Sequence, residues 1–289
     1  MHDLLRVFSR KTRTVAIWMV LTLSVNAVYG QDYEPLDLAQ RIFSRDSFPD
    51  IEKYITGEYE GTPNGQDFLE NLRVEFRMLG QAETDAVVAM SLVGSTGDGI
   101  DIYLYFKKDS VWKLSAIRAL AMMGMMREIK VEMEQMTLEQ VDDHIAKSQQ
   151  EGEFSLFTSR DDYNFQLGSF GLVLELDDNI INHFKANEAE FERLKDLAVV
   201  QLKDSSMEAD GSIELIENLK SDYQKLFIAA VSTNDYELGN GINFLIGGIL
   251  DNTVGYLYVR DEEDLPKMNP SRVIMIRKMD KGWYLYKTT

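Results

Sequence analysis

Three residues in the first half of the chain carry side chains suited to acid–base chemistry. Asp101, Tyr103 and Tyr105 alternate with apolar residues, so in an extended strand they would share one face. If that face lined a dry pocket, burial could raise the pKa of the aspartate until it served as a general base beside two phenols. The alternative is a half-exposed strand face on which tyrosine serves as a good β-former.

A second group of candidates lies near the C-terminus and is aromatic. On an exposed sheet face, large aromatic side chains would form a contact surface for a partner. The alternative is that they pack one strand face into the core. The candidate binding residues are Tyr256, Tyr258, Trp283, Tyr284 and Tyr286.

Two further motifs have simple structural interpretations. The methionine cluster at 122–126 could offer soft ligands to Cu(I), but its spacing continues through Ile129 to Met133 as the apolar stripe of a helix. The glycine-rich run at 94–99 lacks the Gly-Lys-Ser/Thr ending of a phosphate-binding loop and is typical of a hairpin turn.

The acidic and histidine residues predict no metal site. The acidic runs at 161–162 and 261–264 lack the alternating spacing of a calcium loop, which favours solvated charge. His144 and His183 lie in predicted helices without the His-Glu-x-x-His spacing of a zinc protease. We therefore predict no metal and no cofactor.

An antiparallel sheet is predicted to position Asp101 and its neighbours. Residues 72–78 alternate strictly between apolar and charged types, although Phe68, Leu72 and Phe76 also fit a helical period. We favour the strand, because short turns follow and join further strands in a meander. The predicted strands are 72–78, 86–93, 100–106 and 111–118.

The rest of the chain predicts helices followed by a second meander. A capping box at Thr137 and Gln140 falls inside the first helical stretch. Helices are predicted over 119–147, from 177 through 197, and over 212–227. Strands are predicted over 154–157, 163–176, 242–250, 254–259, 272–279 and 283–287.

The segment 106–117 (FKKDSVWKLSAI) resembles the last hairpin of cystatin-like and nuclear-transport-factor-2-like domains, and the rhythm of elements extends the resemblance over 36–118. The resemblance implies a curved antiparallel sheet wrapped around a helix. Members range from dehydratases and isomerases to non-catalytic binding modules, so it implies no single activity. Active members usually pair an acid in the cone with a histidine or a second acid, and no histidine occurs between His2 and His144.

The predicted fold is α+β, with two units that each pack helices on an antiparallel β-meander. Trp112 and Trp283 stand at equivalent places, at the start of the last strand of each meander. We divide the chain into a signal peptide (1–30), a cystatin-like/nuclear-transport-factor-2-like domain with trailing helices (31–150) and a second α+β domain (151–289).

The first thirty residues predict export. A basic start precedes an apolar run at 15–25, which is short for a bilayer span of about 20 residues. Small residues then allow cleavage after Ala27 or Gly30; an uncleaved anchor is the alternative. We expect a periplasmic or secreted protein with no stable membrane insertion after cleavage.

Composition narrows the possible partners. The net charge is −18, and it falls to −21 without residues 1–30, which hold four basic residues and one acidic residue. Such a chain repels nucleic acid and anionic membranes. Because it has no cysteine, disulfides, thiolate zinc sites and a lipoprotein anchor are excluded.

These features together predict a non-enzymatic exported binding or interaction protein. Its partner would be another exported protein or a small ligand, and no nucleic acid. One alternative is a lyase or isomerase that uses Asp101, Tyr103 and Tyr105 in a pocket. Another is an inhibitor or immunity partner of a basic protein, which the acidity would suit.

Overall fold

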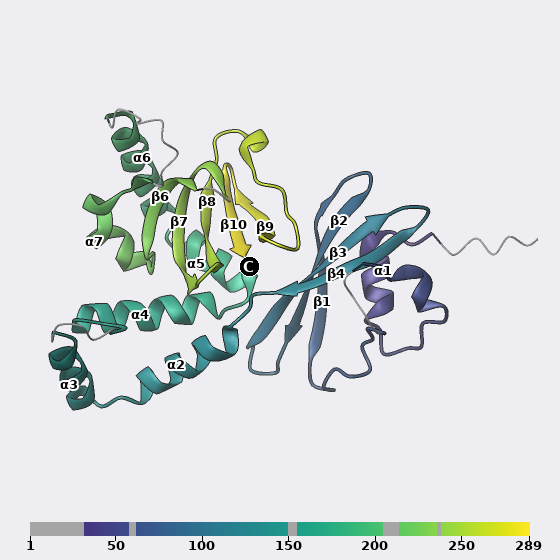
Figure 1. Cartoon of the computed structure of the whole chain (residues 1–289), viewed down its shortest axis with the longest axis horizontal. Coiled ribbons are helices and arrows are strands. Elements are labelled where there is room, and N and C mark those ends of the chain that lie inside the picture. The colour runs from purple at the N-terminus through teal and green to yellow at the C-terminus, as the bar shows by residue number, and fades with distance from the viewer. Residues whose placement is uncertain (1–31, 58–61, 150–154, 205–213, 236–237) are drawn as a thin grey trace, which may run out of the picture. The chain divides into compact units, whose positions relative to one another are not determined.

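Two antiparallel sheets organise the computed structural model of this chain, which describes residues 32–57, 62–149, 155–204, 214–235 and 238–289 (Figure 1). The first sheet has the order β1-β2-β3-β4 and the second the order β5-β6-β7-β8-β10-β9. The predicted α+β class is therefore confirmed. Residues 32–289 group into one compact unit, and the predicted signal peptide lies outside the described residues.

The first sheet consists of the four strands that residue alternation predicts. Because residues 73–81 pair with the next strand, the helical alternative for this stretch is wrong. The glycine run at 94–99 is a hairpin turn, in which the Gly94 N–H donates to the Asp98 carbonyl at 2.7 Å. The strands are β1 (Arg73–Gln81), β2 (Asp85–Val93), β3 (Gly99–Lys108) and β4 (Trp112–Ala119).

Both faces of this sheet are covered. Leu104 and Phe106 of β3 pack in one core with helix α1 (Pro35–Ile42). Tyr103 and Tyr105 point to the opposite face and belong to a core shared with the later helices and the second sheet. Because these tyrosines are buried on that second face, the half-exposed strand face is wrong.

The helical stretch after the first sheet divides at the predicted capping box. The Thr137 hydroxyl accepts the Gln140 N–H at 3.2 Å, and the Gln140 side chain accepts the Thr137 N–H at 2.8 Å. Met126 and Met133 are buried, as the helical stripe predicts. The two helices are α2 (Met123–Gln135) and α3 (Leu138–Ser148).

The predicted strand at 163–176 is wrong, because this segment forms helix α4 (Arg160–Val173). Ser159 caps the helix by accepting the Asp162 N–H at 3.0 Å. Residues 155–157, predicted as part of another strand, are irregular. Small residues let α4 approach the second sheet closely, and the Ser169 hydroxyl donates to the Ile246 carbonyl at 2.7 Å.

Two later predictions also need correction. The single helix expected from residue 177 breaks at Asn187 into α5 (Asp177–Ala186) and α6 (Glu188–Asp204), with the Asn187 amide bound to a carbonyl of the preceding turn. The helix expected over 212–227 is shortened, among described residues, to consecutive helical turns at 217–226, with α7 (Lys220–Tyr223) between two 3-10 turns. The chain before these turns pairs with the sheet as β5 (Glu214–Leu215).

The four strands that the sequence predicts after residue 240 all form, but their predicted meander order is wrong. The last strand (283–288) pairs with both the 252–258 strand and the 273–280 strand, which leaves 273–280 at the edge of the second sheet. An aromatic cluster from α5, α6 and the sheet fills its inner face. No helix in the described part of the chain has the length and apolar character needed to cross a membrane. Its other strands are β6 (Ala230–Asp235), β7 (Gly239–Ile249), β8 (Asn252–Tyr258), β9 (Val273–Asp280) and β10 (Trp283–Thr288).

Candidate functional site

Asp101 and Tyr103 share one face of β3, as predicted, but they bind to a helix and do not line an open pocket. One carboxylate oxygen of Asp101 accepts the Asp177 N–H at 2.6 Å, and the other accepts the Ser91 hydroxyl. The Tyr103 hydroxyl lies 3.0 and 3.1 Å from the two carboxylate oxygens of Asp177 and donates to that group. These contacts attach the start of α5 to the first sheet.

A buried ion pair completes this polar cluster. The Lys287 ammonium lies 2.8 Å from a carboxylate oxygen of Asp177, and each side chain is only 3% exposed. The same ammonium lies 5.9 Å from the centre of the Tyr103 ring. Asp177 is the first residue of α5, where the helix dipole also favours a negative charge. The cluster therefore joins β3, α5 and β10.

Burial raises the pKa of the other two members, Asp101 and Tyr103. Burial, and then the nearby Asp177 carboxylate, raise the pKa of Asp101 above its ordinary value of 3.8, while Lys287 opposes the shift. Burial, with Asp177 and Asp101, holds the pKa of Tyr103 well above 10, so the phenol stays a donor. Both Asp101 oxygens already accept hydrogen bonds, which suits a structural role better than proton transfer.

The raised pKa of Asp101 gives the direction of a pH effect. A carboxyl group with a higher pKa in the folded state contributes stability that is full below its unfolded pKa and is lost as pH rises through the folded pKa. Asp101→Asn does not titrate, so its stability relative to the native chain should rise with pH from about 4 upwards. Urea unfolding of both proteins at about pH 4, 5.5 and 7 measures this difference.

Asp46→Asn, which alters an exposed carboxylate, is the matched control for this experiment. A stability difference between Asp101→Asn and the native chain that stays constant across the pH range would contradict the burial effect.

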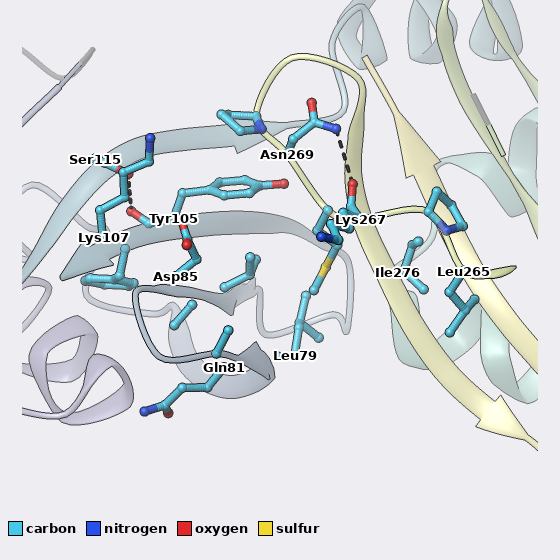
Figure 2. A pocket seen from close by; sticks show the side chains of 18 of the residues that line it. Leu79, Gln81, Asp85, Tyr105, Lys107, Ser115, Leu265, Lys267, Asn269 and Ile276 are labelled. Atoms are coloured by element: carbon cyan, nitrogen blue, oxygen red, sulfur yellow. Dashed lines mark hydrogen bonds between the residues drawn. The ribbon is translucent and has the colours of Figure 1, made fainter. Parts of the chain in front are cut away.

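A separate cavity of about 790 Å³ opens between the first sheet and the loop at 265–270 (Figure 2). The cavity is partly open to solvent, and most of its lining is apolar. Its buried or half-buried apolar wall includes Leu79, Val87, Tyr105, Ile276 and Tyr284. Exposed charged residues in its lining are Asp85, Lys107, Lys267 and Lys278.

Tyr105 and Arg118 of the first sheet bind the chain on the other side of this cavity, at strand β9 and at the loop before it. The Tyr105 hydroxyl donates to the Ile274 carbonyl at 2.8 Å, and burial raises the pKa of the phenol, which keeps its proton. The Arg118 guanidinium donates to the Pro270 carbonyl at 2.5 Å. Within the loop, the Asn269 amide donates to the Lys267 carbonyl at 3.2 Å (Figure 2). Of the three predicted residues on β3, Tyr105 lines the cavity and Asp101 and Tyr103 do not.

The predicted aromatic contact surface is wrong for four of its five members. Both faces of the second sheet are covered, and Tyr256, Trp283, Tyr284 and Tyr286 are at most 3% exposed. Tyr258 is partly buried against the same aromatic core. Of the five, Tyr284 lines the cavity, so core packing is the main role of the group.

The two histidines among the described residues, His144 and His183, both donate to neutral oxygen atoms. The Ser155 hydroxyl donates its single proton to the Phe157 carbonyl at 2.6 Å, so the His144 Nε2 at 3.0 Å must be the donor and cannot activate the serine. His183 donates to the Leu226 carbonyl at 3.1 Å, and burial lowers its pKa. Within the described ranges, no three His, Asp or Glu side chains are placed to hold a metal ion.

Sequence reasoning missed the Lys287–Asp177 pair and the loop that bounds the cavity. One signal for Lys287 was present, since a period of two puts it on the same strand face as Trp283 and Leu285. Both neighbours on that face are buried. Asp177 gave no such signal, because an acidic residue at the start of a helix is common on a surface.

No family model matches this chain, and comparisons with curated proteins and with solved structures give no match either.

Proposed function

We propose that this chain is a non-enzymatic binding protein that takes the apolar part of a ligand into the cavity beside the 265–270 loop. The cavity itself supports this function, because its 790 Å³ fall within the range of about 300–1,000 Å³ typical of small-molecule sites. Its wall is apolar, and its charged residues are exposed. Asp101 and Tyr103, the groups that a lyase or isomerase would need, do not line it.

A neutral fluorescent probe tests this proposal. N-phenyl-1-naphthylamine should bind the purified chain with one-to-one, saturable fluorescence enhancement, because the probe is apolar and small enough to enter. Met268→Trp adds a large ring to the half-buried loop residue next to Gly80 and should weaken binding at least about tenfold by filling the cavity.

Leu138→Trp is the control for that variant, because it places the same ring on an exposed helix residue that does not line the cavity. Equal probe binding by both tryptophan variants would count against the cavity as the site. Absence of saturable binding to the native chain would remove the proposal.

We also propose that the protein acts outside the cytoplasm, as the basic start and the apolar run at 15–25 favour. Mass measurement of the chain from a bacterial envelope fraction should give a mature N-terminus at residue 28 or 31. A chain that keeps its first thirty residues would contradict export by cleavage.

For residues 36–118 we propose a cystatin-like/nuclear-transport-factor-2-like domain. Support comes from α1 packed on one face of an antiparallel sheet with the order β1-β2-β3-β4. Such domains serve many functions, so this proposal adds no activity to the binding role.

A further inference from the structure

The net charge of the residues that line the cavity is positive, whereas the net charge of the whole chain is negative. The whole chain carries a net charge of −18, yet the lining contains three lysines and a single aspartate. A local excess of positive charge on an acidic protein attracts anions to one place, while the remaining surface repels them. This observation concerns the ligand of the proposed binding function and rests on that function.

Lys107 is placed for this role by the strand that carries it. Residues two apart on a strand share a face, so Lys107 lies on the same side of β3 as Tyr105, which lines the cavity. Asp85 is its partner in the register of β2 and β3. Over the ranges that the structure describes, the Lys107 ammonium makes no ion pair.

Of the two other lysines in the lining, Lys278 already pairs with a carboxylate and Lys267 does not. Lys278 lies 2.5 Å from a carboxylate oxygen of Glu262 and is therefore paired. Lys267 belongs to the loop, is exposed, and makes no ion pair with any residue that the structure describes. Lys107 and Lys267 thus remain available to an anionic group from outside the protein.

We propose that the ligand is an anionic amphiphile, with its apolar chain in the cavity and its carboxylate, or a similar anionic head, at Lys107 and Lys267. The apolar wall favours the chain by removing it from water. The lysines favour the anion over a neutral or cationic head of the same length. Each exposed lysine should contribute a factor of about 2–5 in affinity, as exposed ion pairs do.

Three ligands with the same ten-carbon chain test the sign of the head group: decanoate, 1-decanol and decyltrimethylammonium. Each is titrated against the probe-loaded native chain at concentrations below micelle formation. Decanoate should bind about tenfold more tightly than decanol, and the ammonium ligand more weakly than either. Lys107→Gln and Lys267→Gln should each weaken decanoate about 2–5-fold and leave decanol unchanged.

Two further variants sharpen the comparison. Lys108→Gln is the matched control, because Lys108 is adjacent in the strand but its ammonium lies 5.4 Å from the Trp112 ring centre and it does not line the cavity. Its affinity for decanoate should stay native. Asp85→Asn removes the acidic lining residue and should strengthen decanoate binding.

The outcomes separate this inference from the proposed function. Equal affinity for all three ligands, or tighter binding of the ammonium ligand, would overturn the anionic preference and leave the binding function standing. An equal loss in Lys108→Gln and Lys107→Gln would remove the assignment to Lys107. If none of the ligands displaces the probe and the probe itself does not bind, the proposed function fails.

Discussion

Replacing Lys287 by methionine is expected to lower the free energy of unfolding by about 3–5 kcal/mol. The substitution leaves the Asp177 carboxylate, which is 3% exposed, without its counter-charge in the interior. Asp101 lies beside it and adds a second acidic group to the same buried cluster. A buried charge without a partner is among the few mechanisms that destabilise a protein by this amount. Urea unfolding at pH 7 measures the loss.

Lys278→Met provides the matched control, because it breaks a lysine–carboxylate pair on the surface. The Lys278–Glu262 pair is 2.5 Å long, but its side chains are 59% and 69% exposed, so its loss should cost less than about 1 kcal/mol. In the double variant Asp177→Asn/Lys287→Met, removal of both charges should recover part of the stability. Equal losses in the two single variants would show that burial of the pair contributes little.

The strands were predictable because their pattern is local. Each strand of the first sheet alternates apolar and polar residues or carries a short turn beside it, and both signals belong to neighbouring residues. The same period of two predicted that Asp101 and Tyr105 share one side of β3. It could not predict that a second layer buries this side, because the covering residues come from the other half of the chain.

Helix α4 shows how a local pattern can mislead. Tyr163, Phe165 and Leu167 alternate as in a strand, yet Tyr163, Leu167 and Phe170 also share a helical face. The capping residue Ser159 and the acidic first turn were the signals that favoured a helix. Packing against the second sheet then stabilises the helical period, since Phe170 is buried and Ser169 binds a strand carbonyl.

The cavity could not be predicted from a sequence pattern. Its wall combines the four strands of the first sheet with a loop and two strands from the C-terminal part, so it exists only after the tertiary fold is formed. The charged residues in its lining belong to elements distant in the sequence, and the excess of lysine over aspartate among them is apparent only once the fold brings them together. Chemistry that depends on one strand, such as the face shared by Asp101 and Tyr103, is the part that sequence reasoning recovers.

Trp283→Ala is the second substitution with a large expected effect, about 3–5 kcal/mol of destabilisation. The indole is 1% exposed, and its ring centre lies 5.0 Å from that of Phe184 and 5.1 Å from that of Phe244. Removing it leaves a void between α5 and the second sheet, in a cluster of rings that also stabilise one another. Thermal and urea unfolding report the change.

Comparison of the two buried tryptophans, Trp283 and Trp112, distinguishes the contribution of ring packing to stability from that of the indole hydrogen bond. The Trp283 Nε1 donates to a Glu192 carboxylate oxygen at 2.6 Å, whereas the Trp112 Nε1 is buried with no hydrogen-bond partner in the described part of the chain. Phenylalanine at either position shortens the ring system, but only at Trp283 does it remove a bond to a charged acceptor. Trp283→Phe should therefore cost about 1.5–3 kcal/mol more than Trp112→Phe. Equal costs for the two would show that the Glu192 contact adds nothing to stability beyond the packing of the ring.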